Sequence, residues 1–167
     1  MPLFMPGNAD ITIRTARPED LKAVHEIELL SFPRPWPRTA FEAELLHPFS
    51  EFWVAVHGQT VVGYAILRCY ETTGHLINIA VHPDWRRRGI GRRLLEWVID
   101  WARSRRLLAI YLEVRVSNLT AQRLYERMGF VRAGRIKHYY TPDGEDAWVY
   151  RLVVPRHRTS PSNPSKS

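Results

Sequence analysis

The sequence predicts an α/β protein with a mixed sheet that carries helices on its faces. Some short segments alternate apolar and polar residues, as strands do, while others repeat apolar residues every three to four positions, as helices do. These segments follow one another in the order β-α-α-β-β-β-α-β-α-β-β. The length of 167 residues allows one domain with a sizeable core.

The first strand and the first helix lie near the N-terminus. Residues 11–15 alternate as a strand, and Pro18 then stands near the start of a helix whose first turn holds two acids, where the helix dipole favours them. The apolar stripe of this helix is expected to consist of Leu21, Val24, Ile27 and Leu30. Three prolines in residues 33–37 end the helix, because proline cannot continue it.

A short second helix and three strands follow. Thr39 with Glu42 has the pattern of a capping box, which predicts the start of that helix. Residues 51–70 are rich in β-forming residues and predict a hairpin that turns near Gly58. Residues 75–81 predict a further strand, which runs directly into the stretch RRRGIGRR.

Helices and strands alternate in the second half. The helix after the arginine stretch is expected to bury Leu94, Leu95, Val98, Trp101 and Ala102. Residues 108–116 form the clearest strand, with Glu113 on its polar face. The next helix is expected to present Ala121, Leu124, Tyr125 and Met128 on one face. It stops near Gly129, and two last strands at residues 131–139 and 147–153 flank a turn.

The domain limits follow from composition. We expect residues 11–154 to form a single domain, since no internal repeat or linker interrupts them. Residues 1–10 are expected to be a flexible leader. Residues 155–167 are basic and rich in proline and serine, which predicts a disordered tail.

Composition also excludes several classes of protein. No apolar run approaches the roughly 18 residues of a membrane span, and no secretory signal is evident at the N-terminus. The single cysteine, Cys69, excludes an intramolecular disulfide and lies in an apolar run, as a small core residue does. We therefore expect a cytoplasmic protein without membrane contact. The scattered histidines predict no metal site.

The positive charge is concentrated at one place. The net charge is +7, and the last 13 residues contain three basic and no acidic residues, which leaves +4 for the other 154. The five arginines between residues 86 and 93 exceed that +4 by themselves. A nucleic-acid binder spreads basic residues along a face to meet successive phosphates, so one tight cluster suits one compact anion better.

The stretch RRRGIGRR joins a strand to an amphipathic helix. Glycines let the backbone approach a ligand, and the first N–H groups of a helix have no internal partner and favour an anion. Arginines beside them can add charge-assisted hydrogen bonds to phosphate oxygens. The spacing differs from the GxGxxG dinucleotide fingerprint, and no Lys-Ser/Thr pair follows as in ATP-binding loops. A pyrophosphate site is favoured over a solvated charge run.

At this stretch the sequence resembles the GNAT acetyltransferases, whose consensus in the loop is Arg/Gln-x-x-Gly-x-Gly/Ala; Arg86, Gly89 and Gly91 match it. The segments YLEVRVSNLTAQRLYERMGF and KHYYTPDGEDAWVYRL are similar to protein N-terminal acetyltransferases of the archaeal amino-terminal and bacterial RimI types. The resemblance covers about residues 11–153. It implies the GNAT fold, with a mostly antiparallel sheet and helices on both faces. It also implies direct transfer from acetyl-CoA to the α-amine of protein N-termini, including those of ribosomal proteins.

The resemblance further implies where acetyl-CoA binds. Its pyrophosphate would rest on the loop formed by Arg86, Arg87, Arg88, Gly89, Ile90, Gly91 and Arg92. The backbone of Ile79, Ala80 and Val81 would pair with the pantetheine arm, on a strand that in relatives diverges from its neighbour and offers an N–H to the thioester oxygen. Asn118 and Tyr125 match positions that approach the pantetheine and the sulfur.

Two residues are candidates for the base that deprotonates the acceptor amine, whose pKa is about 8. Glu113 lies on the polar face of its strand, and the match of LEVRVSN to the family favours it. His75 is a residue type suited to base work at neutral pH, and in the archaeal relatives a His and a Glu at these positions are both associated with catalysis. The choice between them stays open, as does a water between base and amine.

The resemblance assigns the remaining roles. Tyr125 would protonate the departing thiolate, since a phenol with a pKa of about 10 keeps its proton at pH 7. The peptide would bind between the first helical segment and the last hairpin. The expected walls of that slot are Phe32, Pro33, Trp36, Tyr139 and Tyr140.

Two other functions stay open. The acceptor of the same reaction could be a small amine, an antibiotic or a lysine. Alternatively, the chain could be a non-enzymatic basic module that binds RNA or the ribosome with an affinity that falls steeply with salt. The arginine stretch has no interleaved aromatic residues, which argues against specific nucleic-acid binding. A ribosome contact made by the tail is compatible with catalysis.

Overall fold

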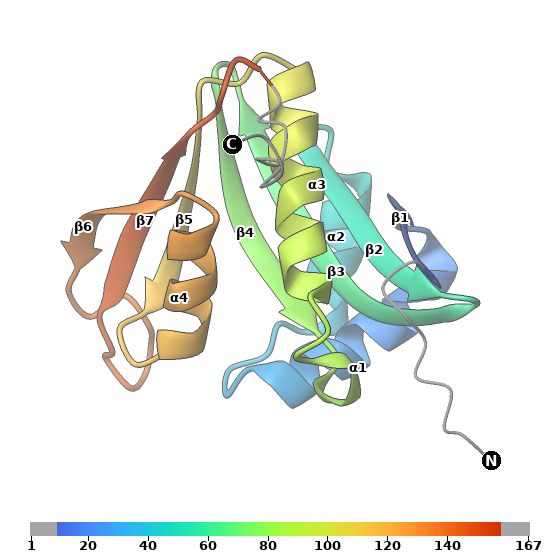
Figure 1. Ribbon diagram of the computed structural model, residues 1–167. Coiled ribbons are helices and arrows are strands. Elements are labelled where there is room, and N and C mark those ends of the chain that lie inside the picture. The colour runs from blue at the N-terminus through green and yellow to red at the C-terminus, as the bar shows by residue number, and fades with distance from the viewer. Residues whose placement is uncertain (1–9, 158–167) are drawn as a thin grey trace.

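The fold is known from a computed structural model, which describes residues 10–157 (Figure 1). The strands are β1 (Ile11–Thr15), β2 (Ser50–His57), β3 (Thr60–Tyr70), β4 (Thr73–Val81), β5 (Ala109–Arg115), β6 (Val131–Ile136) and β7 (Ala147–Val153). The helices are α1 (Leu21–Ser31), α2 (Arg38–Leu46), α3 (Ile90–Ser104) and α4 (Leu119–Arg127), with short 3-10 turns at Pro18–Asp20 and Pro83–Trp85. The predicted order of elements is confirmed.

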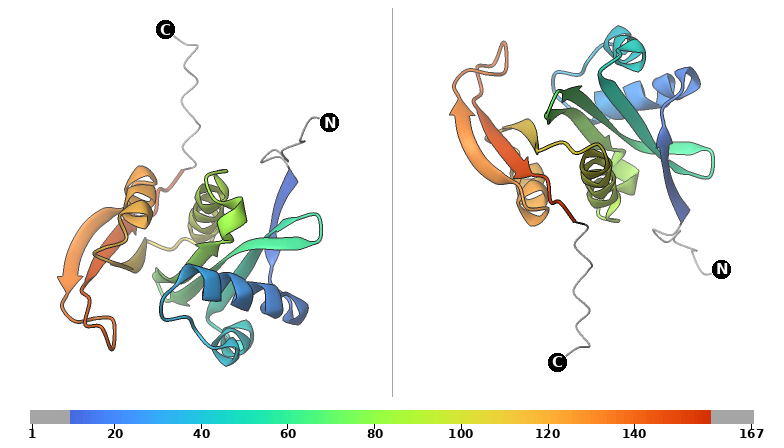
Figure 2. Two further views of the ribbon diagram at one scale, coloured as in Figure 1. Left: turned by 90° about the horizontal axis from the view of Figure 1, so that it is seen from below. Right: turned by 90° about the horizontal axis from the view of Figure 1, so that it is seen from above.

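The seven strands form one sheet in the order β1-β2-β3-β4-β5-β7-β6. Only β4 and β5 are parallel, and every other neighbouring pair is antiparallel. Helices α1 and α2 cover one face of the sheet, whereas α3 and α4 lie on the other face (Figures 1 and 2). The expected fold class, a mixed and mostly antiparallel sheet with helices on both faces, is confirmed.

Both faces of the central strands are buried, because helices cover each of them. On β2, Trp53 and Ala55 pack in the same core as α3, while Phe52 and Val54 pack in the same core as α1 and α2. The residues of α3 that enter the first core are Ile90, Leu94, Leu95, Val98, Ile99 and Ala102. Trp101 packs at the edge of that core and is only partly buried.

Strands β4 and β5 pair along only part of their length. Their ladder has three residue pairs and ends at His75 and Tyr111. On the other side of β4, the register against β3 shifts between Ile66 and Leu67, so that Ile77 has no opposing residue and forms a β-bulge. A bulge bends its strand, and beyond this point β4 and β5 diverge (Figures 1 and 2).

The divergence leaves backbone groups of β4 without a strand partner. The N–H of His82 donates to the carbonyl of Val62 at 2.8 Å. Bonded pairs alternate along antiparallel strands, so the next residue of β4 that bonds to β3 is Ala80. Ile79 and Val81 therefore direct their N–H and C=O groups away from β3. No strand within residues 10–157 pairs with this part of β4.

The predicted capping box at Thr39 and Glu42 does not form. Helix α2 begins at Arg38 and its N-cap is Pro37, two residues before the predicted N-cap Thr39. Proline has no side-chain hydrogen bond to offer. Because the fixed extended backbone of Pro37 sets the helix start, Glu42 lies a full turn inside the helix. It pairs with Arg38 at 3.6 Å instead.

Other differences concern single positions. Leu30 was expected in the apolar stripe of α1 but is 57% exposed, and Glu28 is buried there instead. Strand β5 is one residue shorter at each end than predicted, and the Leu108 side chain lies in solvent. Strand β6 ends at Ile136, because His138 adopts a φ of 54° that an extended strand cannot contain.

The predictions for the chain ends concern residues that lie mainly outside the described part. Of the expected leader, residues 1–10, only residue 10 is described, and of the expected tail, residues 155–167, only 155–157 are. The leader, the tail and the domain limits stay predictions. Within residues 10–157, no helix is long and apolar enough to span a membrane.

Candidate active site

The loop between β4 and α3 presents backbone N–H groups at the start of a helix. Gly89 is the N-cap of α3 and has a φ of 77°, in the left-handed region that favours glycine. Arg87 has a φ of 62°, which is uncommon for a residue with a side chain. No side chain among residues 10–157 caps α3 at Gly89, so these residues leave the first N–H groups of the helix open to a ligand. The helix dipole favours an anion there.

Most arginines of the stretch RRRGIGRR already contact other groups of the protein. Arg86 donates to the Val81 carbonyl and to the Ser31 hydroxyl, both at 3.1 Å. Arg88 lies over the ring of Trp85. Arg92 pairs with Glu96 at 3.0 Å, and Arg93 donates to the Ile11 carbonyl at 2.9 Å. The described residues offer the Arg87 side chain no hydrogen bond or ion pair. The backbone and Arg87 are therefore the groups of the loop that remain to face an anion.

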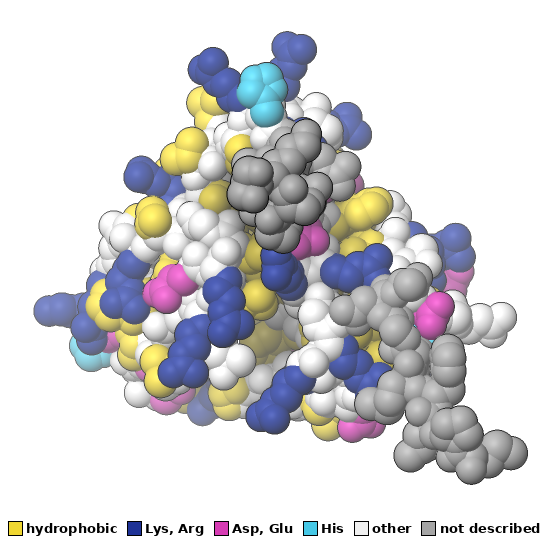
Figure 3. All heavy atoms as spheres, viewed as in Figure 1, with side chains coloured by type: hydrophobic (Ala, Val, Ile, Leu, Met, Phe, Trp, Pro, Cys, Tyr) yellow, Lys and Arg dark blue, Asp and Glu magenta, His cyan; other side chains and the backbone are white. Residues whose placement is uncertain are grey.

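Helices α3 and α4 come close together beside this loop. A Cβ atom added to Gly91 would lie 3.3 Å from the Cδ2 atom of Leu124, so glycine permits the approach. Lys and Arg side chains flank the gap between these helices on the face seen in Figure 3. An anionic ligand is thus favoured on the side of the sheet that carries α3 and α4.

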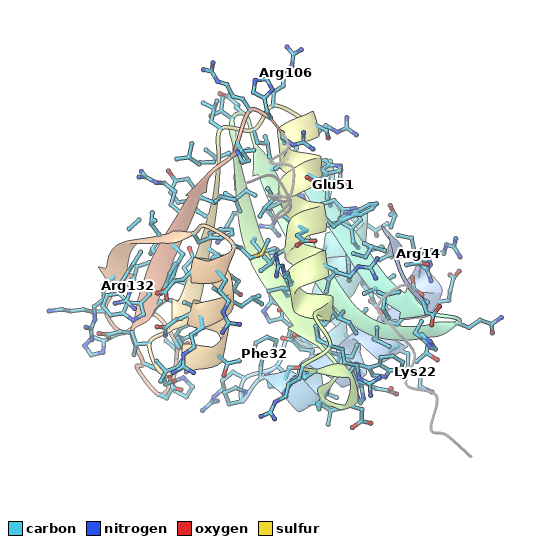
Figure 4. The ribbon with its side chains drawn as sticks, in the orientation of Figure 1. Arg14, Lys22, Phe32, Glu51, Arg106 and Arg132 are labelled. Carbon is cyan, nitrogen blue, oxygen red and sulfur yellow. The ribbon has the colours of Figure 1, made fainter. Side chains whose placement is uncertain are left out.

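A cavity of about 230 Å³ lies between the diverging strands and the loop that joins α1 to α2. The predicted site residues that line it are Phe32, Pro33, Trp36, Ile79, Glu113, Asn118, Tyr125 and Tyr140. Phe32 lies below the gap between the two halves of the sheet (Figure 4). Tyr139 does not line the cavity but packs edge-on against Tyr140, with ring centroids 4.9 Å apart. Ala80 is buried in the core shared with α1 and α2.

His75 and Glu113 meet where β4 and β5 part. The Nε2 atom of His75 lies 2.5 Å from Oε2 of Glu113. The side chains are 31% and 20% exposed, so solvent and substrate can reach both. The sheet register explains the contact, because His75 is the last residue of β4 to pair with β5, opposite Tyr111. Glu113 follows Tyr111 by two positions and points to the same face.

Tyr125 is buried at the wall of the cavity. It is 7% exposed, and the rings of Phe130 and Tyr150 pack against it at centroid distances of 5.8 and 6.2 Å. Burial, and then the neighbouring Tyr140, raise the pKa of the Tyr125 hydroxyl, which therefore holds its proton at neutral pH. Asn118 accepts a backbone N–H at 3.1 Å as the N-cap of α4, and so fixes the helix that carries Tyr125.

Arg115 anchors the β6–β7 loop, which carries the tyrosine wall. Its guanidinium bonds to Asp143 at 2.8 Å and to Glu145 at 3.1 Å, and it lies 4.1 Å from the ring centroid of Tyr140. Glu145 also accepts the hydroxyl and the N–H of Ser117, at 3.0 and 3.1 Å. The segments LEVRVSN and YYTPDGEDA are thus parts of one hydrogen-bonded network, although their bonded charged groups are 28 and 30 positions apart in the sequence.

Two buried polar residues of the cavity wall were not predicted. Glu28 of α1 and Asn78 of β4 both line the cavity and are both buried. The signal for Glu28 is its place among the apolar residues of a helix face. An acid is buried at such a position only where hydrogen-bond donors satisfy it, so its presence indicates a polar contact within the protein. The signal for Asn78 is similar, because it is the one polar residue in the apolar run of residues 76–81.

Larger hollows elsewhere lack comparable chemistry. One of about 570 Å³ contains Cys69, which packs partly buried against the main core. Burial, and then the charge of Glu51, raise the pKa of the Cys69 thiol to about 11, so it is a poor nucleophile. Another of about 640 Å³ lies beside the ion pair of Arg14 and Asp20. In the described part of the chain, no three His, Cys, Asp or Glu residues are grouped to hold a metal ion.

This fold is that of an acyltransferase family. The chain belongs to the acetyltransferase (GNAT) family, whose model matches residues 21–130. The resemblance noted in the sequence is confirmed.

Several relatives are similar over most of their length. The chain is 37% identical over 145 residues to the ribosomal protein bS18-alanine N-acetyltransferase of Escherichia coli K12, covering 86% of this chain and 97% of the relative. It is 39% identical over 147 residues to the N-alpha-acetyltransferase RimI of Mycobacterium tuberculosis, covering 84% and 91%. The crystal structure of Ard1 from Thermoplasma volcanium matches with a TM-score of 0.81 at 28% identity, over 87% of this chain and 99% of that one.

Replacing Arg115 by glutamine should raise the pKa of the Asp143 and Glu145 carboxyls. The N–H of Glu145 and then Arg115 hold the pKa of Asp143 below its usual range, and Ser117 and Arg115 do so for Glu145. A contact that lowers the pKa of a carboxyl stabilises the folded protein fully above the usual pKa of about 4. This stabilisation is lost as the pH falls through the lowered pKa. An NMR titration of the carboxyl carbons measures both values.

Arg135→Gln is the matched control, because Arg135 contacts Asp146 at 2.7 Å and is not part of the Arg115 network. This control should raise the pKa of Asp146 and leave Asp143 unchanged. Identical titrations of Asp143 and Glu145 in the wild type and the Arg115 variant would contradict the network.

Proposed function

We propose that the protein transfers the acetyl group of acetyl-CoA directly to the α-amine of protein N-termini. The observation that carries the proposal is the 2.5 Å contact of His75 and Glu113 at the fork of β4 and β5, beside a cavity walled by aromatic residues. The names of the E. coli and M. tuberculosis relatives support the same reaction.

The loop and the free strand fit acetyl-CoA. The open N–H groups at the start of α3, next to Gly89, suit the pyrophosphate. The unpaired N–H groups of Ile79 and Val81 suit the amides of the pantetheine arm, as an added strand would. Bound there, acetyl-CoA supplies an acetyl group activated as a thioester. The hydrogen bond from Arg86 to the Val81 carbonyl fixes the loop relative to the strand.

The residues of the chain handle two protons. We assign the base to Glu113, because it lines the cavity, and we make His75 its hydrogen-bonded partner. Glu113 takes a proton from the acceptor amine, and the pair can share it. As the amine nitrogen bonds to the acetyl carbon and the C–S bond breaks, Tyr125 donates its proton to the sulfur. An N–H of the free edge of β4 can stabilise the acetyl oxygen meanwhile.

The shape of the cavity favours a chain end with a small first side chain. Phe32, Trp36 and Tyr140 bound a space of about 230 Å³, which suits an N-terminus better than a lysine within a strand. The E. coli relative is named for the alanine of ribosomal protein bS18. We propose alanine as the preferred first residue here, with ribosomal proteins among the acceptors.

The wider context belongs to the same proposal. Residues 11–154 would form the whole catalytic domain, and the reaction would take place in the cytoplasm, where ribosomal proteins are made. The basic residues of the tail, Arg156, Arg158 and Lys166, would favour contact with the ribosome. The mechanism uses no metal ion.

Mass spectrometry of peptides incubated with the protein and acetyl-CoA tests the proposal. The peptides differ in their first residue, and each is paired with an N-terminally blocked copy that carries an internal lysine. We expect acetylation of free N-termini only, fastest with alanine first. Transfer to the internal lysine, or to small amines alone, would contradict the assigned acceptor, and salt-sensitive RNA binding without any transfer would contradict the enzyme.

In the same assay, Glu113→Gln should lower kcat by about 10²- to 10⁴-fold, the usual contribution of a general base. The Kd of acetyl-CoA should stay unchanged, because Glu113 lies outside the loop between β4 and α3, which we call the phosphate loop. Glu42→Gln is the control, since that acid is 53% exposed on α2 and does not line the cavity. Wild-type turnover in the Glu113 variant would remove this residue from the mechanism and leave His75 as the base.

A further inference from the structure

Glu28 is an acid buried where a helix should present an apolar residue. It lies on α1 with 1% of its surface exposed, on the side that faces the sheet with Val24 and Ile27. A buried carboxylate is strongly unfavourable unless hydrogen bonds satisfy its oxygens. The donors around Glu28 therefore indicate what the acid is for.

Three donors from three different elements reach this carboxylate. The Oε1 atom accepts the backbone N–H of Trp36 at 3.0 Å. The Oε2 atom accepts the side-chain amide of Asn78 at 2.9 Å and the hydroxyl of Tyr64. Burial and the charge of Glu28 raise the pKa of Tyr64, so the phenol keeps the proton that it donates. One side chain thus joins α1, β3, β4 and the loop after α1.

The loop of residues 32–37, which we call the acceptor-wall loop, has few anchors of its own. Its sequence is FPRPWP, and proline has no N–H, so only three of its six residues can donate from the backbone. The donations found are those of Phe32 and Trp36, and both end on Glu28: Phe32 at its carbonyl, at 3.1 Å, and Trp36 at its carboxylate. The Phe32 bond is the last backbone bond of α1, so the Glu28 side chain fixes the loop through the Trp36 N–H alone. The Trp36 ring also packs against Phe41, with ring centroids 5.3 Å apart.

The same carboxylate holds the loop against the strand that faces it. Trp36 and Asn78 both line the cavity, one from the acceptor-wall loop and one from β4 beyond its bulge. The contact between them through Glu28 sets the distance across the cavity. At the start of the loop, the Ser31 hydroxyl accepts from Arg86 of the phosphate loop at 3.1 Å.

We propose that Glu28 is a positioning residue for the acceptor, which fixes the acceptor-wall loop against β4 and thereby sets peptide affinity and selectivity for the first residue. This inference rests on the proposed N-terminal acetyl transfer. Glu28 does not itself touch the amine, since both of its oxygens are occupied by protein donors. Its loss should act on the binding of the peptide rather than on the binding of acetyl-CoA.

The test compares Glu28→Leu with Glu28→Gln. Leucine fills a similar volume and leaves the Trp36 N–H without an acceptor, so we expect the KM of an alanine-first peptide to rise about tenfold, with reduced preference over bulkier first residues. The kcat and the Kd of acetyl-CoA should change little. Glutamine can keep the Trp36 contact if the Asn78 amide turns over, so Glu28→Gln should retain nearly the wild-type KM.

Glu44→Leu is the matched control, because Glu44 is another buried acid, held by Arg68 and Ser50 and not part of the cavity wall. It should lower stability without raising the peptide KM. A folded Glu28→Leu protein with unchanged KM and selectivity, or with an equal loss of acetyl-CoA affinity, would overturn the proposal. If that variant does not fold, Asn78→Ala, which removes only the strand side of the connection, must show the peptide-selective rise in KM.

Hydrogen exchange of the Trp36 amide separates this inference from the proposed function. The amide should be protected in the wild type and in Glu28→Gln and should exchange freely in Glu28→Leu, whatever the acceptor of the enzyme. Free exchange in the wild type would overturn the anchoring role. A protected Trp36 amide in a protein that acetylates no peptide would support the anchoring role of Glu28 and would refute the proposed N-terminal acetyl transfer.

Discussion

Strands β4 and β5 hydrogen-bond over three residue pairs and then part, and the whole candidate site depends on that partial pairing. The paired end holds the two halves of the sheet together and brings His75 within 2.5 Å of Glu113. The bulge at Ile77 bends β4 away directly after it, which opens a cavity and frees backbone groups of Ile79 and Val81. A β4 strand paired along its full length would satisfy those groups and would leave no space for a ligand between the halves.

The two faces of the sheet provide different parts of the site. The α3–α4 face offers the helix N-terminus at Gly89 and a surrounding positive charge, as Figure 3 shows, and so favours an anion. The walls that suit a peptide come from the α1–α2 loop and the β6–β7 loop, which carry Trp36 and Tyr140. Each of these loops is held by charge: Glu28 anchors the first, and Arg115 anchors the second through Asp143 and Glu145. Rigid walls reduce the entropy lost when a peptide binds.

The periodicity of apolar residues was sufficient to predict the order of helices and strands, because the repeats of both are local properties of the chain. It placed Glu113 on a polar strand face, and the family resemblance paired it with His75; the register of β4 and β5 brings the two together. The pattern failed where tertiary contacts override local preference. Leu30 fits an apolar stripe but faces solvent, while Glu28 is buried because donors from the following loop and from two strands, 36 and 50 residues away, meet it. Likewise, the arginine cluster is visible in the sequence, but the partners that occupy Arg86 and Arg93, Ser31 and Ile11, lie more than 50 residues away.

Amide hydrogen exchange of β4, with and without acetyl-CoA, tests the central claim most directly. Without ligand, the N–H of Ala80 should be protected by β3, and the N–H groups of Ile79 and Val81 should exchange much faster, since local exchange reports unpaired backbone. Saturating acetyl-CoA should slow the amide exchange of Ile79 and Val81 and leave the exchange rate of Ala80 unchanged. Equal protection of all three amides without ligand, or no change at Ile79 and Val81 on saturation, would contradict the account of the divided sheet as the cosubstrate site.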